Sequence, residues 1–137
     1  MADAVIVDAV RTPFGDRDGA FRDTHPQDLA AAPLAALESR VDFDPAVVED
    51  VVYGCVTPKG DQGSNIARIA PLVAGWGDDL GDDPDAGDSY TGRHGPPGVQ
   101  LNRMCGSGQQ AVNFAAGQVA AGFQDVVVAG GVEHMTR

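Results

Sequence analysis

The sequence predicts an α/β fold with a mostly parallel sheet, and three observations support this prediction. Short apolar runs of strand length alternate with longer Ala- and Leu-rich stretches of helical spacing. Four such alternations occur, and right-handed crossovers between them would place successive strands parallel. The chain has 137 residues, within the range of about 100–150 residues that is commonest for one domain. We therefore expect one domain over residues 1–137.

The N-terminal part is expected to contribute a strand and a helix. Residues 4–10 form a short apolar run that is typical of a buried strand. Residues 27–40 place Leu and Ala at helical spacing, and Pro33 inside them predicts a kink or a later start. The next strand is expected within residues 47–56. A second helix should then follow a Ser-Asn pair, which is suited to cap it, and end at Gly75.

The C-terminal part begins with a segment of different composition. Residues 77–97 contain six Asp, five Gly and three Pro, which predicts an acidic surface loop inserted into the domain. A short strand at residues 98–103, a helix at 106–122 and a last strand at 125–131 complete the pattern. The helix is rich in Ala and Gly with few charges, so we expect it to be buried and closely approached on nearly every side.

The overall composition excludes several functions. Nine Lys and Arg stand against 20 Asp and Glu, a net charge of −11, which makes nucleic acid a poor partner. No apolar run approaches the roughly 20 residues of a membrane span, and no signal peptide is apparent. Two cysteines are too few for a disulfide framework, and neither has zinc-site spacing, so no metal is expected. We expect a cytoplasmic protein with free thiols.

The acidic charge has an unusual make-up. Asp supplies 17 of the 20 acidic residues, and Lys59 is the only lysine. Short, strongly hydrated carboxylates keep a surface soluble in salt concentrated enough to reduce the Debye length to about 3 Å. This favours a halophilic cytoplasm, with a merely acidic protein as the alternative.

The candidate nucleophile is Cys105, at the expected turn into the helix of residues 106–122. A thiol at a helix N-terminus lies near free N–H groups and the positive end of the dipole, which favour the reactive thiolate. Gly106 and Gly108 flank Ser107 and permit the sharp turn of a nucleophile elbow. The Cys105 N–H is also a candidate oxyanion donor. The alternatives are an inert cysteine, which is our interpretation of Cys55, and a phosphate loop, whose glycine spacing is absent.

Five ordered blocks of the sequence resemble the N-terminal half of thiolases, the acyl-CoA acetyltransferases. The blocks are residues 9–15, 54–56, 62–68, 101–108 and 129–135. The block LNRMCGSG, which contains Cys105, is the most specific of them. The resemblance implies a thiolase-like N-terminal domain, incomplete in this chain, that binds no cofactor and uses coenzyme A thioesters as substrates.

The resemblance also implies a mechanism. Cys105 takes an acyl group from acyl-CoA as a thioester, and the deprotonated methyl carbon of acetyl-CoA attacks that thioester in a Claisen condensation. The reverse reaction cleaves 3-ketoacyl-CoA with CoA. Because thiolases pair into dimers near the strand that precedes the nucleophile, residues 99–102 are expected at an interface, in a homo-oligomer or with a complementary thiolase-like subunit.

Three departures from the family pattern limit this expectation. The chain ends at Arg137, before the family's activating histidine, second cysteine and CoA-binding loop domain, and its own His25, His94 and His134 match no family histidine. Gln109 replaces a usually apolar residue. His134 replaces a small residue, and we interpret it as a solvated or core histidine. We therefore expect little thiolase turnover from this chain alone.

Two other functions remain open. One is a non-catalytic remnant or partner subunit of a thiolase-like assembly. The other is a related condensing enzyme, of the ketoacyl synthase or hydroxymethylglutaryl-CoA synthase type.

Overall fold

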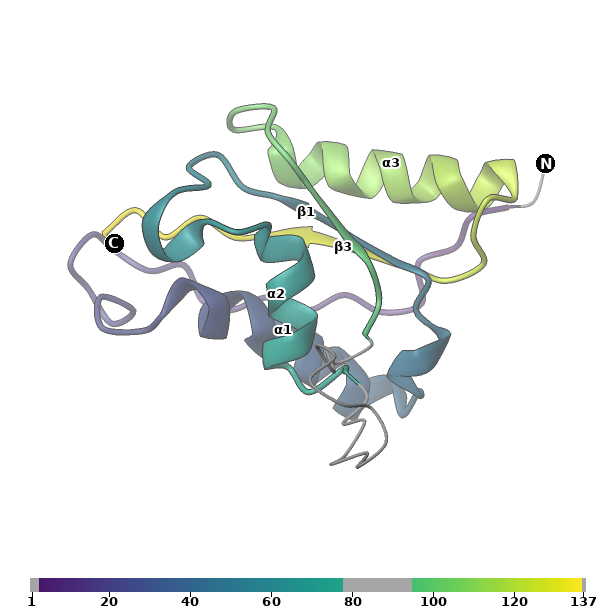
Figure 1. Ribbon diagram of the computed structural model, residues 1–137, viewed down its shortest axis with the longest axis horizontal. Helices are drawn as coiled ribbons and strands as arrows, with labels where there is room; N and C mark the ends of the chain where they lie inside the picture. The colour runs from purple at the N-terminus through teal and green to yellow at the C-terminus, as the bar shows by residue number, and fades with distance from the viewer. Residues whose placement is uncertain (1–2, 78–94, 137) are drawn as a thin grey trace, which may run out of the picture.

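The computed structural model describes residues 3–77 and 95–136, and its centre is a three-stranded parallel sheet (Figure 1). The central strand is β1 (Asp50–Gly54), with β2 (Gly98–Leu101) on one side and β3 (Val127–Gly131) on the other. The predicted parallel α/β class is confirmed, in an incomplete form.

Helices cover both faces of this sheet. Helices α1 (Pro26–Val41) and α2 (Ile66–Val73) lie on one side, and α3 (Ser107–Ala121) lies on the other (Figure 1). Two short 3-10 helices, η1 (Pro45–Val47) and η2 (Gly60–Gln62), lie in the connections before and after β1. The predicted helices and the strands from residue 47 onward are thus confirmed, with shorter strands than expected.

The side chains of β1 alternate between the two faces, as the period of a strand requires. Val51 and Tyr53 pack in the larger core cluster with Leu34 of α1 and Ile66 of α2. Val52 points to the opposite face, where its buried partners are two alanines of α3. All five residues of β1 are buried, so this strand joins the two halves of the core.

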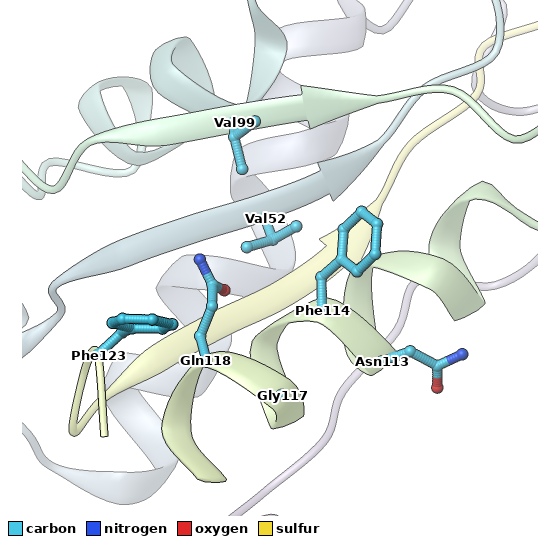
Figure 2. A pocket seen from close by; sticks show the side chains of 7 residues that line it. All are labelled: Val52, Val99, Asn113, Phe114, Gly117, Gln118 and Phe123. Carbon is cyan, nitrogen blue, oxygen red and sulfur yellow. The ribbon is translucent and has the colours of Figure 1, made fainter. Parts of the chain in front are cut away.

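Helix α3 is buried along one side only, which corrects the expectation that it is enclosed. Its buried residues are Ser107, Ala111 and Ala115. Beside them lies an open hollow of about 480 Å³, and Figure 2 shows Phe114 and Gln118 of α3 among the side chains at its rim. The sequence prediction failed because Ala and Gly allow other elements to pack closely on every side of the helix, but burial also requires that such elements be present.

Residues 4–10 do not form the expected strand. They are extended but unpaired, and Val5, Ile6 and Val7 are between 77% and 80% exposed. An apolar run becomes a strand only where a neighbouring strand satisfies its N–H and C=O groups. No strand of the described residues pairs with this segment, which is tied instead through Asp8 to Arg40, with Nε and Oδ2 2.8 Å apart.

Prolines lie inside both N-terminal helices, and the predicted later start of the first helix is wrong. Helix α1 begins before Pro33, at Pro26, where a missing N–H costs nothing. His25 is its N-cap, and the His25 Nδ1 accepts a hydrogen bond from Gln27 N at 3.3 Å. The helix therefore starts from a cap that the apolar spacing of residues 27–40 did not reveal.

Helix α2 begins after Asn65, as the Ser-Asn pair predicts, but the Asn65 side chain does not cap it. Asn65 has a left-handed φ of 56° and makes no side-chain cap. The first N–H of the helix, at Ile66, instead donates to Gln100 Oε1 of β2 at 3.0 Å.

The acidic insert predicted at residues 77–97 lies almost wholly outside the described residues. Among those residues, no helix is long and apolar enough to cross a membrane.

Candidate active site

The candidate site lies where β2 turns into α3, at the carboxyl ends of the three parallel strands. Open α/β sheets bind their ligands at this edge. Cys105 is exposed there, one residue before Gly106, the N-cap of α3. The strand-to-helix placement predicted for this thiol is therefore found.

The turn that carries Cys105 is sharply bent and held by side chains. Met104 has a φ of 50°, a left-handed conformation that is unfavourable for a residue with a Cβ. Ser107 Oγ accepts a hydrogen bond from Arg103 N at 2.8 Å and donates one to Met104 O at 2.6 Å. Ser107 itself is buried, so its side chain holds the turn from the inner side.

The start of α3 presses directly against the end of β1. A Cβ placed on Gly54 would lie 2.4 Å from the Ser107 carbonyl carbon and 2.6 Å from Gly108 N. Only glycine permits so close an approach of two backbones. Gly54 therefore sets the distance between the central strand and the helix that follows Cys105.

Asn102 and Glu133 link the turn to the loop that follows β1. The Asn102 Nδ2 donates to Val56 O at 2.9 Å, and the Asn102 Oδ1 accepts from Met104 N at 2.9 Å. Glu133 Oε2 accepts from Val56 N at 2.7 Å and from Thr57 N at 3.3 Å. The sequence blocks contained both residues, but their roles were not predicted. The available signal for Asn102 was the tendency of Asn to bind the backbone N–H two residues ahead in an Asx turn.

Cys55 is the buried counterpart of Cys105. It lies directly after β1, and its N–H donates to Leu101 O at 3.0 Å. Burial raises the pKa of the Cys55 thiol, and the negative charge of Glu133 raises it further. Both effects disfavour the thiolate, in agreement with the interpretation of Cys55 as an inert cysteine.

The two described histidines are both engaged away from Cys105. His134 is a core histidine, one of the two alternatives expected for it: it is 5% exposed, and its Nε2 donates to Phe21 O at 2.7 Å. Its backbone N–H donates to the buried Gln62 Oε1. His25 caps α1. Within residues 3–77 and 95–136, no hydrogen bond joins a histidine to the Cys105 thiol, and His94 lies outside this range.

Gln109 lies in the first turn of α3 and is exposed. Its Nε2 donates to Asn113 Oδ1 at 3.1 Å on the same helix. Its polarity is therefore accommodated at the surface, without disturbance of the core.

The described part of the chain contains no group of three or more His, Cys, Asp or Glu placed to hold a metal ion.

The described residues thus form a parallel α/β domain that presents an exposed thiol at a strand-to-helix turn. The family model described as "Thiolase, N-terminal domain" matches residues 4–80 and 92–137. The chain belongs to the thiolase family, as its five sequence blocks predict.

Relatives and a solved structure agree with this assignment. Over 137 residues the chain is 42% identical to a steroid 3-ketoacyl-CoA thiolase of Mycobacterium tuberculosis, covering 100% of this chain and 30% of the relative. It is 38% identical over 141 residues to the beta-ketoadipyl-CoA thiolase of Pseudomonas putida, with the same coverage. The crystal structure of the Bacillus anthracis acetyl-CoA acetyltransferase superposes with a TM-score of 0.74 at 35% identity, covering 93% of this chain and 28% of that one. The chain spans about 30% of the length of these relatives.

Proposed function

We propose that Cys105 is the acyl-accepting nucleophile of a thiolase reaction. The observation that carries this proposal is the exposure of the Cys105 thiol beside the N-terminus of α3, within the sequence block most specific to the family. The thiolate adds to the thioester carbonyl of an acyl-CoA, and CoA leaves as its own thiolate. The product is an acyl thioester on Cys105.

The turn supplies a donor for the oxyanion of this step. Gly106 N and Ser107 N donate within the turn, to Arg103 O and Met104 O respectively, both at 3.0 Å. We assign the Cys105 N–H as the donor that faces the reacting carbonyl. A donor held by a rigid turn stabilises developing charge without reorganisation.

The second half-reaction requires a base that the described residues do not bring to Cys105. Acetyl-CoA loses a methyl proton and its carbon attacks the Cys105 thioester, or, in the degradative direction, CoA attacks it. Because His25 and His134 are engaged elsewhere, this chain alone should accept an acyl group but turn over slowly. The proposed partners are a second copy of the chain or a complementary thiolase-like subunit, and the missing base is assigned to the complementary subunit.

The proposed substrates follow from the family, and the proposed salt environment follows from the composition. Relatives are named for 3-ketoacyl-CoA and ketoadipyl-CoA substrates, so coenzyme A thioesters are the proposed substrates, with no bound cofactor. The acidic, Asp-rich composition supports a cytoplasm of high salt concentration. The main alternative is a non-catalytic partner subunit, and the half-exposed Val99 of β2 and Phe114 of α3 favour it.

The test is acylation of the full chain by acetyl-CoA, measured by intact mass and by release of CoA. We expect one acetyl group on the parent chain and on Cys55→Ala, and none on Cys105→Ala. Acetylation that persists in Cys105→Ala, or no acetylation of the folded parent, would contradict the proposal. Faster acylation from acyl-carrier-protein thioesters would instead indicate the ketoacyl synthase type.

A further inference from the structure

Asn102 lies between β2 and the turn, and both ends of its amide are in use. The Oδ1 binds Met104 N, two residues ahead, and the Nδ2 binds Val56 O, 46 residues away in the sequence. One side chain therefore joins the turn that precedes Cys105 to the loop that follows the central strand. The Asn102 amide can do this because its oxygen accepts while its nitrogen donates, from two separate atoms.

The turn depends on such bonds because packing does not impose it. Met104 is 69% exposed, so no core contact holds its backbone in the left-handed conformation. A residue with a Cβ keeps this conformation only where its surroundings fix it. Here the fixing groups are Asn102, which holds the Met104 N–H, and Ser107, which holds the Met104 carbonyl oxygen.

The far end of the Asn102 bridge is itself fixed. The Val56 residue is held on both sides, its N–H by Glu133 and its carbonyl oxygen by Asn102. Glu133 follows β3, where Val132 N donates to Gly54 O at 3.1 Å. The carboxyl ends of β3, β1 and β2 are thus connected in the order Glu133, Val56, Asn102, Met104, and the series ends beside Cys105.

We propose that Asn102 is the positioning residue for the Cys105 thiol and that Glu133 acts through it. This inference rests on the proposed role of Cys105 as nucleophile. Neither residue touches the reacting atoms; together they hold the turn so that the thiol stays at the start of α3, in line with the incoming carbonyl. Small displacements of a reacting group cost large factors in rate.

The experiment uses the full chain with Cys55→Ala, so that Cys105 is the only thiol. Asn102→Ala removes both bonds, and Asn102→Asp keeps an acceptor for Met104 N but loses the donor to Val56 O. The matched control is Asn113→Ala, an exposed amide whose Oδ1 accepts a hydrogen bond from Gln109 Nε2 on the same helix. Circular dichroism and thermal unfolding show whether each variant is folded. If Asn102→Ala does not fold, the comparison is made with Asn102→Asp alone.

The first readout is the acylation rate as a function of acetyl-CoA concentration. We expect both Asn102 variants to lower the saturating rate by roughly ten-fold or more, while the half-saturating concentration is unchanged, because positioning acts on the chemical step. Glu133→Ala should lower the rate in the same direction, and Glu133→Gln, which keeps an oxygen for Val56 N, should restore most of it. The double variant Asn102→Ala/Glu133→Ala should be no slower than Asn102→Ala alone.

The second readout is alkylation of Cys105 by iodoacetamide, which needs no recognition of CoA. Displacement of the thiol from the start of α3 should lower this rate roughly two- to five-fold, the factor that a helix N-terminus supplies. Alkylation of Asn102→Ala at the rate of Asn113→Ala, or additive effects in the double variant, would overturn the inference. A parent chain that is alkylated but never acylated would overturn the proposed function instead, and the alkylation rates would still decide the role of Asn102.

Discussion

The two faces of the sheet differ in how they are covered. Under α1 and α2, large side chains interlock, among them Leu34, Ile66 and Trp76, each at most 4% exposed. Under α3, the buried contacts are the small Ala111 and Ala115 against a single valine of β1. The first face is a conventional hydrophobic core, and the second is a thin contact beside an open hollow.

This difference indicates that the two faces have separate tasks. The α1–α2 face stabilises the domain through burial of apolar area, which contributes about 25 cal/mol per Å². The α3 face places a helix start against a strand end, through the contact at Gly54 and the hydrogen bonds of Asn102 and Ser107. Stability should therefore respond to substitutions on one face, and the geometry of the thiol to substitutions on the other.

The largest effect is expected from Leu34→Ala. Leu34 is fully buried, and truncation leaves a cavity that costs about 2–5 kcal/mol of unfolding free energy. The matched change on the other face is Phe114→Ala, which removes a larger side chain that is 52% exposed and should cost less than about 1 kcal/mol. Urea unfolding measures both, and equal losses would remove the distinction between the faces.

The next effect is expected from Gly54→Ala. The new methyl group would overlap the backbone of Ser107 and Gly108, and overpacking of this kind costs about 1–3 kcal/mol. It should also move the start of α3 and slow alkylation of Cys105. Gly117→Ala is the control, because a Cβ there meets nothing within 4 Å and the change should stabilise the helix by roughly 1 kcal/mol. Thermal unfolding and iodoacetamide kinetics should separate the pair.

The smallest effect is expected from Tyr53→Phe, on the closed face. The Tyr53 hydroxyl donates to Ala30 O at 3.2 Å, and its loss should cost about 1 kcal/mol at neutral pH. Burial raises the pKa of Tyr53 above its usual value, so above about pH 10 the unfolded chain loses this proton first and stability falls as pH rises. Tyr53→Phe should reduce this alkaline slope by about 1.4 kcal/mol per pH unit. An unchanged slope in urea titrations between pH 10 and 12 would contradict the assignment.

The elements of the fold were predictable where a local pattern sufficed. The helix of residues 26–41 shows in the spacing of Ala and Leu, and that of residues 107–121 in its Ala- and Gly-rich run with few charges. The strand of residues 50–54 shows in its β-branched residues. Residues 4–10 have an equally apolar sequence but no partner strand in the described structure, and pairing is a property of the neighbour, which a local pattern does not contain. The incomplete burial of α3 escaped prediction for the same reason.

In the candidate site, too, the features set by local sequence were predictable and those set by distant residues were not. The position of Cys105 follows from the order of strand, turn and helix, which the glycines around Ser107 mark in the sequence. The bonds that connect this turn to the other strand ends involve Glu133 and Val56, which are distant in sequence and brought together by the parallel register. Gly54 shows its importance only once the start of α3 lies against it.

The strand order β2-β1-β3 has a consequence for how the chain folds during synthesis. Val51 in the central strand pairs with Gly98 and Val128, so both of its partners emerge from the ribosome long after it does. The hydrogen bonds of α1 are local and form early, whereas the sheet has high contact order and forms late. Until Val128 arrives, the apolar strand of residues 50–54 is open to pairing with other nascent chains. We expect the yield of soluble protein to be limited by this interval of translation, and to rise when a chaperone shields the strand.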